Sequence, residues 1–129
     1  MSIIDFADAC QELAENLDQE QANLNYEGPQ AITLGKLSSN LSAQASTLRT
    51  LAVAQVIQDS AEAMQALKEG TDAAKDAADK LKKAATAIKI AGLVLSLAAA
   101  IISENPGAVI SAGSSLVSAI KAFEGAGDV

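Results

Sequence analysis

Residues 90–107 read IAGLVLSLAAAIISENPG, and the class of fold follows from this stretch. Its first fourteen residues carry no charge and are dominated by Ala, Leu and Ile. Ala and Leu are among the best helix formers, whereas Asn105-Pro106-Gly107 is a strong signal for a helix stop and a turn. A second uncharged run follows over residues 107–120. The sequence therefore predicts two apolar helices joined by a short turn.

The helical pattern extends in both directions from this turn. The last helix is expected over about 108–123, and the preceding helix over about 72–103. The preceding helix has a regular heptad, which is typical of a coiled coil. Its large positions, seven residues apart, are Leu81, Ile88, Leu95 and Ile102.

Two further helices are expected nearer the N-terminus, over about 3–24 and about 30–69. Apolar residues recur in both at three- and four-residue steps, as they do on one face of a helix. The seam of the second helix slips in phase between Leu51 and Val53. A turn containing Gly28 and Pro29 separates the two helices.

Gly70 offers two alternatives for the middle of the chain. Gly70 suits the left-handed position after a helix end, and Thr71 suits an N-cap, so a break between helices 30–69 and 72–103 is favoured. The alternative is one unbroken helix through Gly70. With the break, the two long helices form an antiparallel hairpin whose tip is Gly70.

Helix lengths then suggest one architecture for a single domain of 129 residues. At 1.5 Å per residue, the two middle helices are about 60 and 50 Å long, and the outer two about 33 and 25 Å. We expect an all-α, elongated up-down four-helix bundle with a long antiparallel coiled-coil hairpin and an apolar C-terminal helical hairpin.

The composition argues against an enzyme and against nucleic-acid binding. The chain has no histidine, which is the commonest general base and a usual zinc ligand. The net charge is −7, and residues 1–29 contain seven acids and no base, whereas phosphate binding needs a basic surface. We therefore expect no catalytic residues, no cofactor, no metal and no small-molecule substrate.

The single cysteine and the N-terminus bear on the cellular location. Cys10 has no partner for an intrachain disulfide, and its expected role is that of a small buried apolar residue. The first residues have neither a basic region nor a long apolar run, so no cleavable signal peptide is expected. The protein is expected to be cytoplasmic, or to be secreted by a leaderless route and to associate with membranes.

Two apolar ridges lie on the helix expected over 72–103. Ile88, Leu95 and Ile102 form the seam toward the hairpin partner. A second ridge and the apolar face of the last helix contribute the expected contact residues, whether the contact is with lipid or with a partner protein. These residues are Ile90, Leu93, Val94, Leu97, Ile101, Val109, Leu116 and Ile120.

Three interpretations of the apolar pair remain open. It is the core of a soluble bundle, a hairpin that enters membranes, or an interface for self-association of a coiled-coil scaffold. The outer faces carry Ser, Ala and Gly where solvated helices usually carry charges, which favours the last two interpretations. In the membrane interpretation, lysines before the apolar run would contact anionic headgroups. These lysines are Lys75, Lys80, Lys82 and Lys83.

The pattern resembles the α-helical pore-forming toxins and the translocator proteins of bacterial injection systems. The resemblance lies in residues 71–89, expected in the coiled coil, followed by the apolar hairpin of residues 90–120 with its Asn105-Pro106-Gly107 turn. It implies a non-enzymatic membrane-interacting protein that acts as a homo-oligomer and inserts residues 90–120. The chain departs from that class in its short length and in lacking much of the usual five-helix body.

Overall fold

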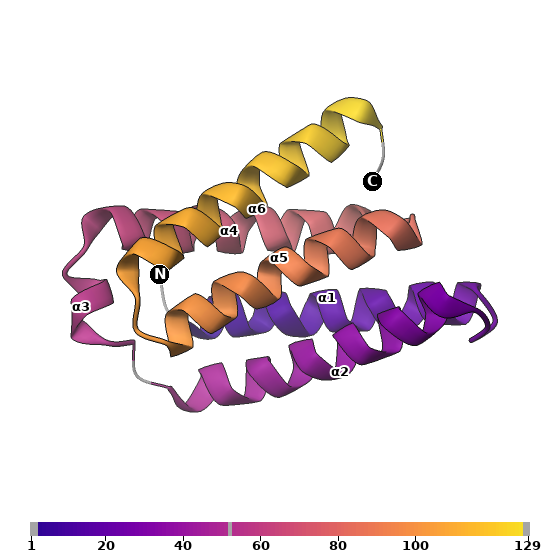
Figure 1. Cartoon of the computed structure of the whole chain (residues 1–129), viewed down its shortest axis with the longest axis horizontal. Helices are drawn as coiled ribbons and strands as arrows, with labels where there is room; N and C mark the ends of the chain where they lie inside the picture. The colour runs from indigo at the N-terminus through magenta and orange to yellow at the C-terminus, as the bar shows by residue number, and fades with distance from the viewer. Residues whose placement is uncertain (1–2, 52, 128–129) are drawn as a thin grey trace.

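The computed structural model describes residues 3–51 and 53–127, and all the regular structure in this part of the chain is helical (Figure 1). Five long helices and one short helix follow one another along the chain. Their bounds are α1 Ile3–Asn23, α2 Pro29–Thr50, α3 Gln55–Gln58, α4 Ala61–Lys80, α5 Ala84–Ile102 and α6 Pro106–Ala126. The all-α prediction is confirmed for the described residues.

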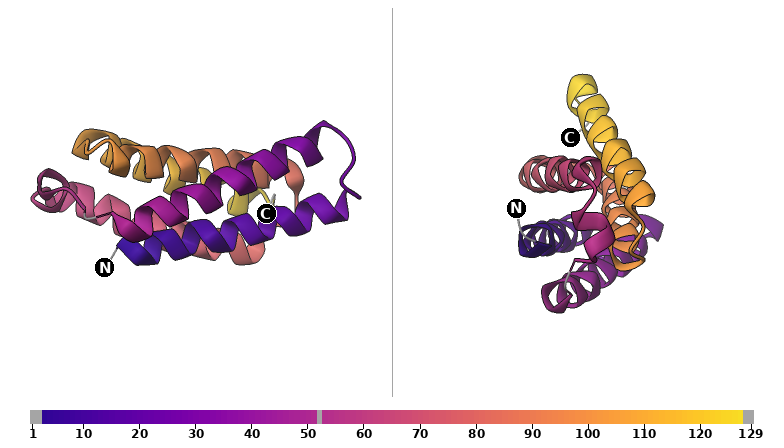
Figure 2. Two further views of the ribbon diagram at one scale, coloured as in Figure 1. Left: turned by 90° about the horizontal axis from the view of Figure 1, so that it is seen from below. Right: turned by 90° about the vertical axis from the view of Figure 1, so that its left-hand side faces the viewer.

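Consecutive long helices run in opposite directions and pack around one apolar core (Figure 2). Helix α1 packs against α2 and α4, while α2 also packs against α5. Helix α6 packs on both α4 and α5. Helix α5 contacts each of the other four long helices, so the most apolar helix of the chain lies at the centre of the packing.

The helix expected over residues 30–69 is divided in the structure. Helix α2 ends at Thr50, Leu51 is extended with φ −86° and ψ 133°, and the short α3 precedes α4. Ser60 begins α4 as its N-cap, because its side chain accepts a hydrogen bond of 3.1 Å from the backbone N–H of Ala63. The phase slip between Leu51 and Val53 is the sequence signal for this break.

The expected break at Gly70 is wrong, because α4 is continuous from Ala61 to Lys80. Gly70 is buried inside α4, and a Cβ atom at this position would lie 2.8 Å from Cδ2 of Leu97. The glycine therefore allows close helix packing and does not end a helix.

The helix expected over residues 72–103 is interrupted at residues 81–83, between α4 and α5. The long coiled-coil hairpin tipped by Gly70 is therefore absent, and the bundle has five long helices where four were expected. The tight helix pairs next to each other in sequence are α1 with α2 and α5 with α6. The apolar C-terminal hairpin is confirmed, with α6 extending to Ala126.

Candidate membrane-interacting helix pair

The turn between α5 and α6 is closed by local hydrogen bonds. The backbone N–H of Ser103 donates to the carbonyl of Ala99, and Glu104 adopts a left-handed conformation with φ 60°. The Asn105 side chain accepts a 3.0 Å hydrogen bond from the N–H of Ala108, and Pro106 begins α6. Proline is favoured at this first position because its missing N–H would have no partner there.

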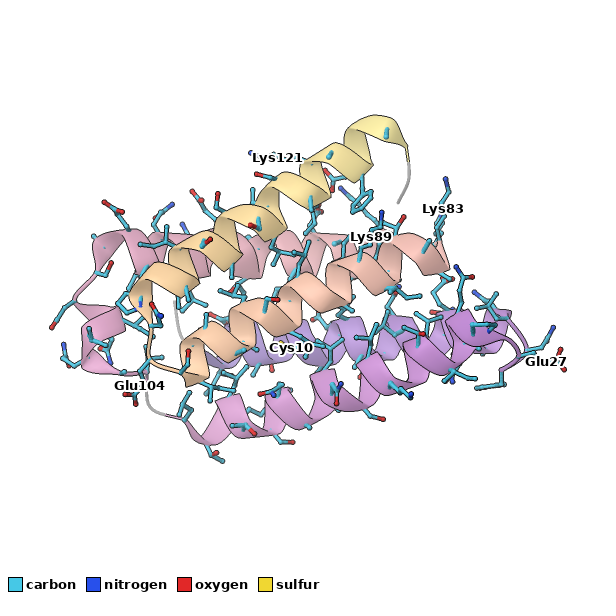
Figure 3. All side chains as sticks on the ribbon, in the orientation of Figure 1. Cys10, Glu27, Lys83, Lys89, Glu104 and Lys121 are labelled. Carbon is cyan, nitrogen blue, oxygen red and sulfur yellow. The ribbon has the colours of Figure 1, made fainter. Side chains whose placement is uncertain are left out.

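Helices α5 and α6 are both long and apolar enough to cross a membrane, as judged by length and composition. Their 19 and 21 residues correspond to about 28 and 31 Å, close to the hydrocarbon thickness of a bilayer. Glu104 is at the turn, and Lys89 and Lys121 lie toward the open end (Figure 3). Glu124 of α6 is also toward the open end. An uncharged layer therefore crosses both helices between these charged ends.

The expected contact residues mostly face the protein interior. Seven of the eight are buried, and Leu93 is partly buried. The buried residues are Ile90, Val94, Leu97 and Ile101 of α5 and Val109, Leu116 and Ile120 of α6. In this conformation they belong to the core, so α5 and α6 would have to leave the other helices before these side chains could meet lipid.

The ridge expected to form the hairpin seam lies at the edge of the core. Ile88, Leu95 and Ile102 are only partly buried and pack against the buried cluster. The face of α5 that points into the core is therefore rotated about the helix axis from the face expected for the coiled coil. This follows from the true neighbours of α5, which are mainly α2 and α6.

The outer face of the helix pair is uncharged and consists of small residues. A shallow groove runs between α5 and α6, with Leu93 among its lining residues. Exposed residues of this groove are Ser96, Ala99, Ser103, Ser111 and Ser115. Solvated helices usually carry charges on such a face, so this face is unusual for a protein surface.

The four lysines expected at headgroups occupy different environments. Lys80 is paired on the surface: its Nζ lies 3.0 Å from Oδ2 of Asp76 and 3.5 Å from Oε1 of Glu124. The hydrogen bond from Lys80 lowers the pKa of Asp76, and the same bond raises the pKa of Lys80. Lys82 and Lys83 are exposed in the turn before α5, while Lys75 is half-buried on α4.

A cation–π contact joins the open ends of the two helices. The Nζ atom of Lys89 on α5 lies 5.8 Å from the centre of the Phe123 ring on α6. Such contacts contribute roughly 0.5–1 kcal/mol at exposed sites. Neither residue was expected to act in this way, because the pairing depends on the register between α5 and α6.

Contacts of α4 with α6 and with α1 have weak or no signals in the sequence. Gly113 of α6 lies against Ala66 of α4, where an added Cβ would be 2.7 Å from the Ala66 carbonyl oxygen. A glycine inside an apolar helical run is a weak signal for such close packing. Asn16 of α1 donates to the carbonyls of Ala78 and Leu81, and no pattern in the sequence indicates this contact.

Chemistry-bearing side chains are placed as follows. Cys10 is buried, as expected, and its burial raises the pKa of the thiol to about 12. Within residues 3–51 and 53–127, no three Cys, Asp or Glu side chains gather in a way that could hold a metal ion.

No protein-family model, curated protein or solved structure matches the chain significantly.

Proposed function

We propose that the protein is a non-enzymatic membrane-interacting subunit whose α5–α6 hairpin enters the lipid bilayer, in the manner of a pore-forming or translocator protein. One observation carries the proposal. Two adjacent helices, joined by a tight turn, each have the length and composition needed to cross a membrane. Their charged residues lie near the turn and at the open end.

The energetics of the bundle favour entry that is triggered by lipid. Ile90, Val94, Leu97 and Ile101 are buried, and each contributes roughly 1.5–3 kcal/mol by its burial. Exposing these four side chains to water would cost about 6–12 kcal/mol, so the hairpin stays in the bundle in solution. Lipid removes most of this cost, because the side chains exchange one apolar environment for another.

The length of the uncharged layer limits how the hairpin would sit in a bilayer. Residues 90–103 rise by about 21 Å, which is less than the hydrocarbon thickness of about 30 Å. Full insertion would place Lys89 just inside one boundary, where its side chain can reach the headgroups. Lys82 and Lys83, which precede α5, would remain at that surface beside anionic lipids.

The small outer face supports association of several hairpins inside the membrane. Transmembrane helices pack through Gly, Ala and Ser, because these residues allow close backbone approach. Ser96, Ser111 and Ser115 are exposed on this face in the bundle. We propose that inserted hairpins assemble into a homo-oligomer through it.

The test is flotation with anionic vesicles, with release of an encapsulated dye read in parallel. The informative variant is Ser96→Lys/Ser115→Lys, which places charges on exposed positions in the middle of α5 and α6. Each lysine at a helix centre costs about 2.5–3.5 kcal/mol on insertion, so dye release should be lost. The added positive charges attract anionic vesicles, so repulsion cannot explain the loss.

The matched control is Ser39→Lys/Ser46→Lys, which adds the same charges to exposed positions of α2. This control should release dye like the parent protein. Circular dichroism would establish that both variants keep the helical fold. If the parent neither floats nor releases dye at neutral and acidic pH, the proposed function is wrong.

The second candidate function is a soluble coiled-coil scaffold that self-associates or binds a protein partner. It is favoured by the burial of seven expected contact residues, since the core helix of a soluble protein has the same apolar character. Sedimentation velocity distinguishes this candidate. A concentration-dependent oligomer without lipid, abolished by Ser96→Lys/Ser115→Lys, together with no flotation, would support the scaffold.

A further inference from the structure

The turn between α4 and α5 contains no residue that breaks helices. It consists of Leu81, Lys82 and Lys83, and its flanking residues are Lys80 and Ala84. Leu, Lys and Ala are all good helix formers. Nevertheless, Leu81 is extended with ψ 126°, and Lys83 is extended with ψ 127°. The local sequence therefore favours one helix where the structure has two.

Several other helix ends of the bundle have local signals, although the end of α2 at Leu51 has no helix breaker either. The α1–α2 turn contains Gly28 with φ 91°, and the α5–α6 turn contains Asn105 followed by Pro106. Helix α4 begins at Ser60, which is a side-chain N-cap. The turn at residues 81–83 has no helix-breaking residue, so tertiary contacts of this turn bear on why it bends.

Asn16 of α1 makes such a tertiary contact at this turn. Its Nδ2 donates hydrogen bonds to the carbonyl oxygens of Ala78, at 3.0 Å, and of Leu81, at 3.3 Å. In a continuous helix these two carbonyls would accept from the N–H groups of Lys82 and Ala85. One side chain of α1 thus replaces two backbone hydrogen bonds that the bend removes.

The bent form also depends on apolar contacts and leaves a polar atom without a partner. The Leu81 side chain is buried with 3% exposure. The Oδ1 atom of Asn16 is buried and has no hydrogen-bond partner among the described residues. Tertiary packing therefore holds the bend, against both local helix preference and incomplete hydrogen bonding.

We propose that α4 and α5 are two halves of one helix, residues 61–102, which straightens when α1 leaves the turn at residues 81–83. The inference deepens the proposed function and rests on it for its trigger, because lipid would draw α5 away from α1 and α2. A helix of 42 residues is about 63 Å long. Its α4 half carries charges and stays in water, while its α5 half is apolar and leads into the bilayer.

Straightening would also separate α4 from α6. In the bundle, Gly70 and Ala66 of α4 lie close to Gly113 of α6. Helix α6 turns back along α5 at residues 103–105, and its 21 residues match the length of α5. In the straight form, α6 therefore remains beside α5 and loses its contact with α4.

The experiment measures a distance across the turn by electron paramagnetic resonance. Spin labels are attached to Lys68→Cys and Ser96→Cys, both at exposed positions, in a full chain carrying Cys10→Ala. The two labels lie thirteen residues before Leu81 and thirteen after Lys83. In the antiparallel bundle they are roughly 10–20 Å apart, one to two helix spacings. A continuous helix separates them by about 42 Å.

The distance is measured in buffer, on vesicles and in trifluoroethanol. Trifluoroethanol dissolves tertiary packing but keeps helices, so it removes the contact with Asn16 without lipid. We expect the short distance in buffer and about 42 Å in the other two conditions. A chain that floats with vesicles but keeps the short distance overturns the straightening and leaves the proposed function intact.

Failure of the proposed function gives a different result. If the chain does not float, trifluoroethanol alone decides the question: a distance of about 42 Å supports the straightening, and a short or broad distribution overturns it.

The variant that isolates the turn is Lys82→Pro. Leu81, with φ −66° and ψ 126°, already has the conformation that a following proline requires. The N–H of Lys82 donates no hydrogen bond within the described part of the chain. The bent form should therefore accept the proline, whereas a continuous helix would lose a hydrogen bond and be kinked or broken, at a cost of about 3 kcal/mol.

We expect Lys82→Pro to keep its helical content in buffer, to show a smaller population near 42 Å on vesicles than the parent, and to lose dye release. Lys82→Gln removes the same charge without blocking the helix and should behave like the parent. Dye release by Lys82→Pro at the parent rate would overturn the inference.

Discussion

Three small residues determine how closely α4 and α6 approach each other. Gly113 lies against the backbone of Ala66. A Cβ atom added to Gly70 would lie 3.7 Å from Cα of Gly113. At Gly70 the closest atom is Cδ2 of Leu97, the end of a flexible side chain. At Gly113 the closest atom is a backbone carbonyl oxygen, which cannot move without moving α4.

The different surroundings of Gly113 and Gly92 predict opposite effects of alanine at these two glycines. Gly113→Ala should lower the free energy of unfolding by about 1–3 kcal/mol, because the helices must separate. Gly92→Ala should raise it by about 0.5–1 kcal/mol, because its Cβ meets no atom within 4 Å and alanine favours the helix. Urea unfolding measures both, and equal stabilities of the two variants would contradict the close packing.

The buried thiol of Cys10 predicts a slow chemical reaction. Burial raises its pKa to about 12, and only the thiolate form attacks thiol reagents. At pH 8, the folded chain should react with a disulfide reagent more slowly than the urea-unfolded chain, by more than about tenfold. Absorbance of the released product gives both rates, and folded and unfolded rates within tenfold of each other would contradict the burial.

At the scale of the element, the end of α4 depends on a side chain from another helix. Asn16 satisfies two carbonyls at the turn, and the N–H of Leu81 donates to the carbonyl of Ala77 at 3.0 Å. Loss of the Nδ2 donor would leave both carbonyls without their partner. A buried carbonyl group that has lost its hydrogen-bond partner destabilises the fold by about 1–3 kcal/mol.

Asn16→Asp tests this contact, because it keeps the size of the side chain and removes the Nδ2 donor. We expect its free energy of unfolding to fall by about 1–3 kcal/mol. Asn23→Asp adds the same charge at an exposed position of α1 and is the control. Denaturant unfolding of both variants gives the comparison, and an equal loss in the two would assign the effect to charge alone.

At the scale of the whole molecule, acidic residues concentrate in α1, which also forms part of the core. The side chain of Glu20 is buried with 7% exposure, and this burial raises its pKa above the usual range. Its folded form therefore binds a proton more readily than its unfolded form. The resulting stabilisation is complete below about pH 4.3, the usual pKa of glutamate, and is lost as the pH rises through the raised pKa.

Glu20→Gln should consequently stabilise the fold at pH 7, because no charge is buried. The gain should disappear at pH 4 and below, where the unfolded chain also binds this proton. Glu15→Gln removes an exposed charge from the same helix and serves as the control. Thermal unfolding at several pH values tests this, and a gain that is independent of pH would contradict the burial effect.

Asp76 has the opposite pH dependence. Its hydrogen bond from Lys80 lowers its pKa, so the stabilisation is present above the usual aspartate pKa and is lost as the pH falls. This pair lies on the surface, where ion pairs contribute little. The bundle should therefore change stability only modestly on mild acidification.

Sequence patterns were sufficient for the features that depend on local chemistry. The all-α class, the bounds of α1 and the α5–α6 turn follow from helix propensity, apolar periodicity and the Asn105-Pro106-Gly107 stop. Burial of Cys10 was also predictable, because it lies on the apolar face of α1. These signals act within a few residues, so one sequence contains them completely.

The tertiary structure alone decided where the middle of the chain bends and which side of α5 faces the core. The carbonyls at the bend accept hydrogen bonds from Asn16, more than sixty residues away, and Gly70 is buried where α5 and α6 pack on α4. Both ridges of α5 are aliphatic, so periodicity could not distinguish Ile90 from Ile88 as the buried position. In a chain built from Ala, Leu and Ile, helices form readily, but their breaks and facing depend on contacts between distant segments.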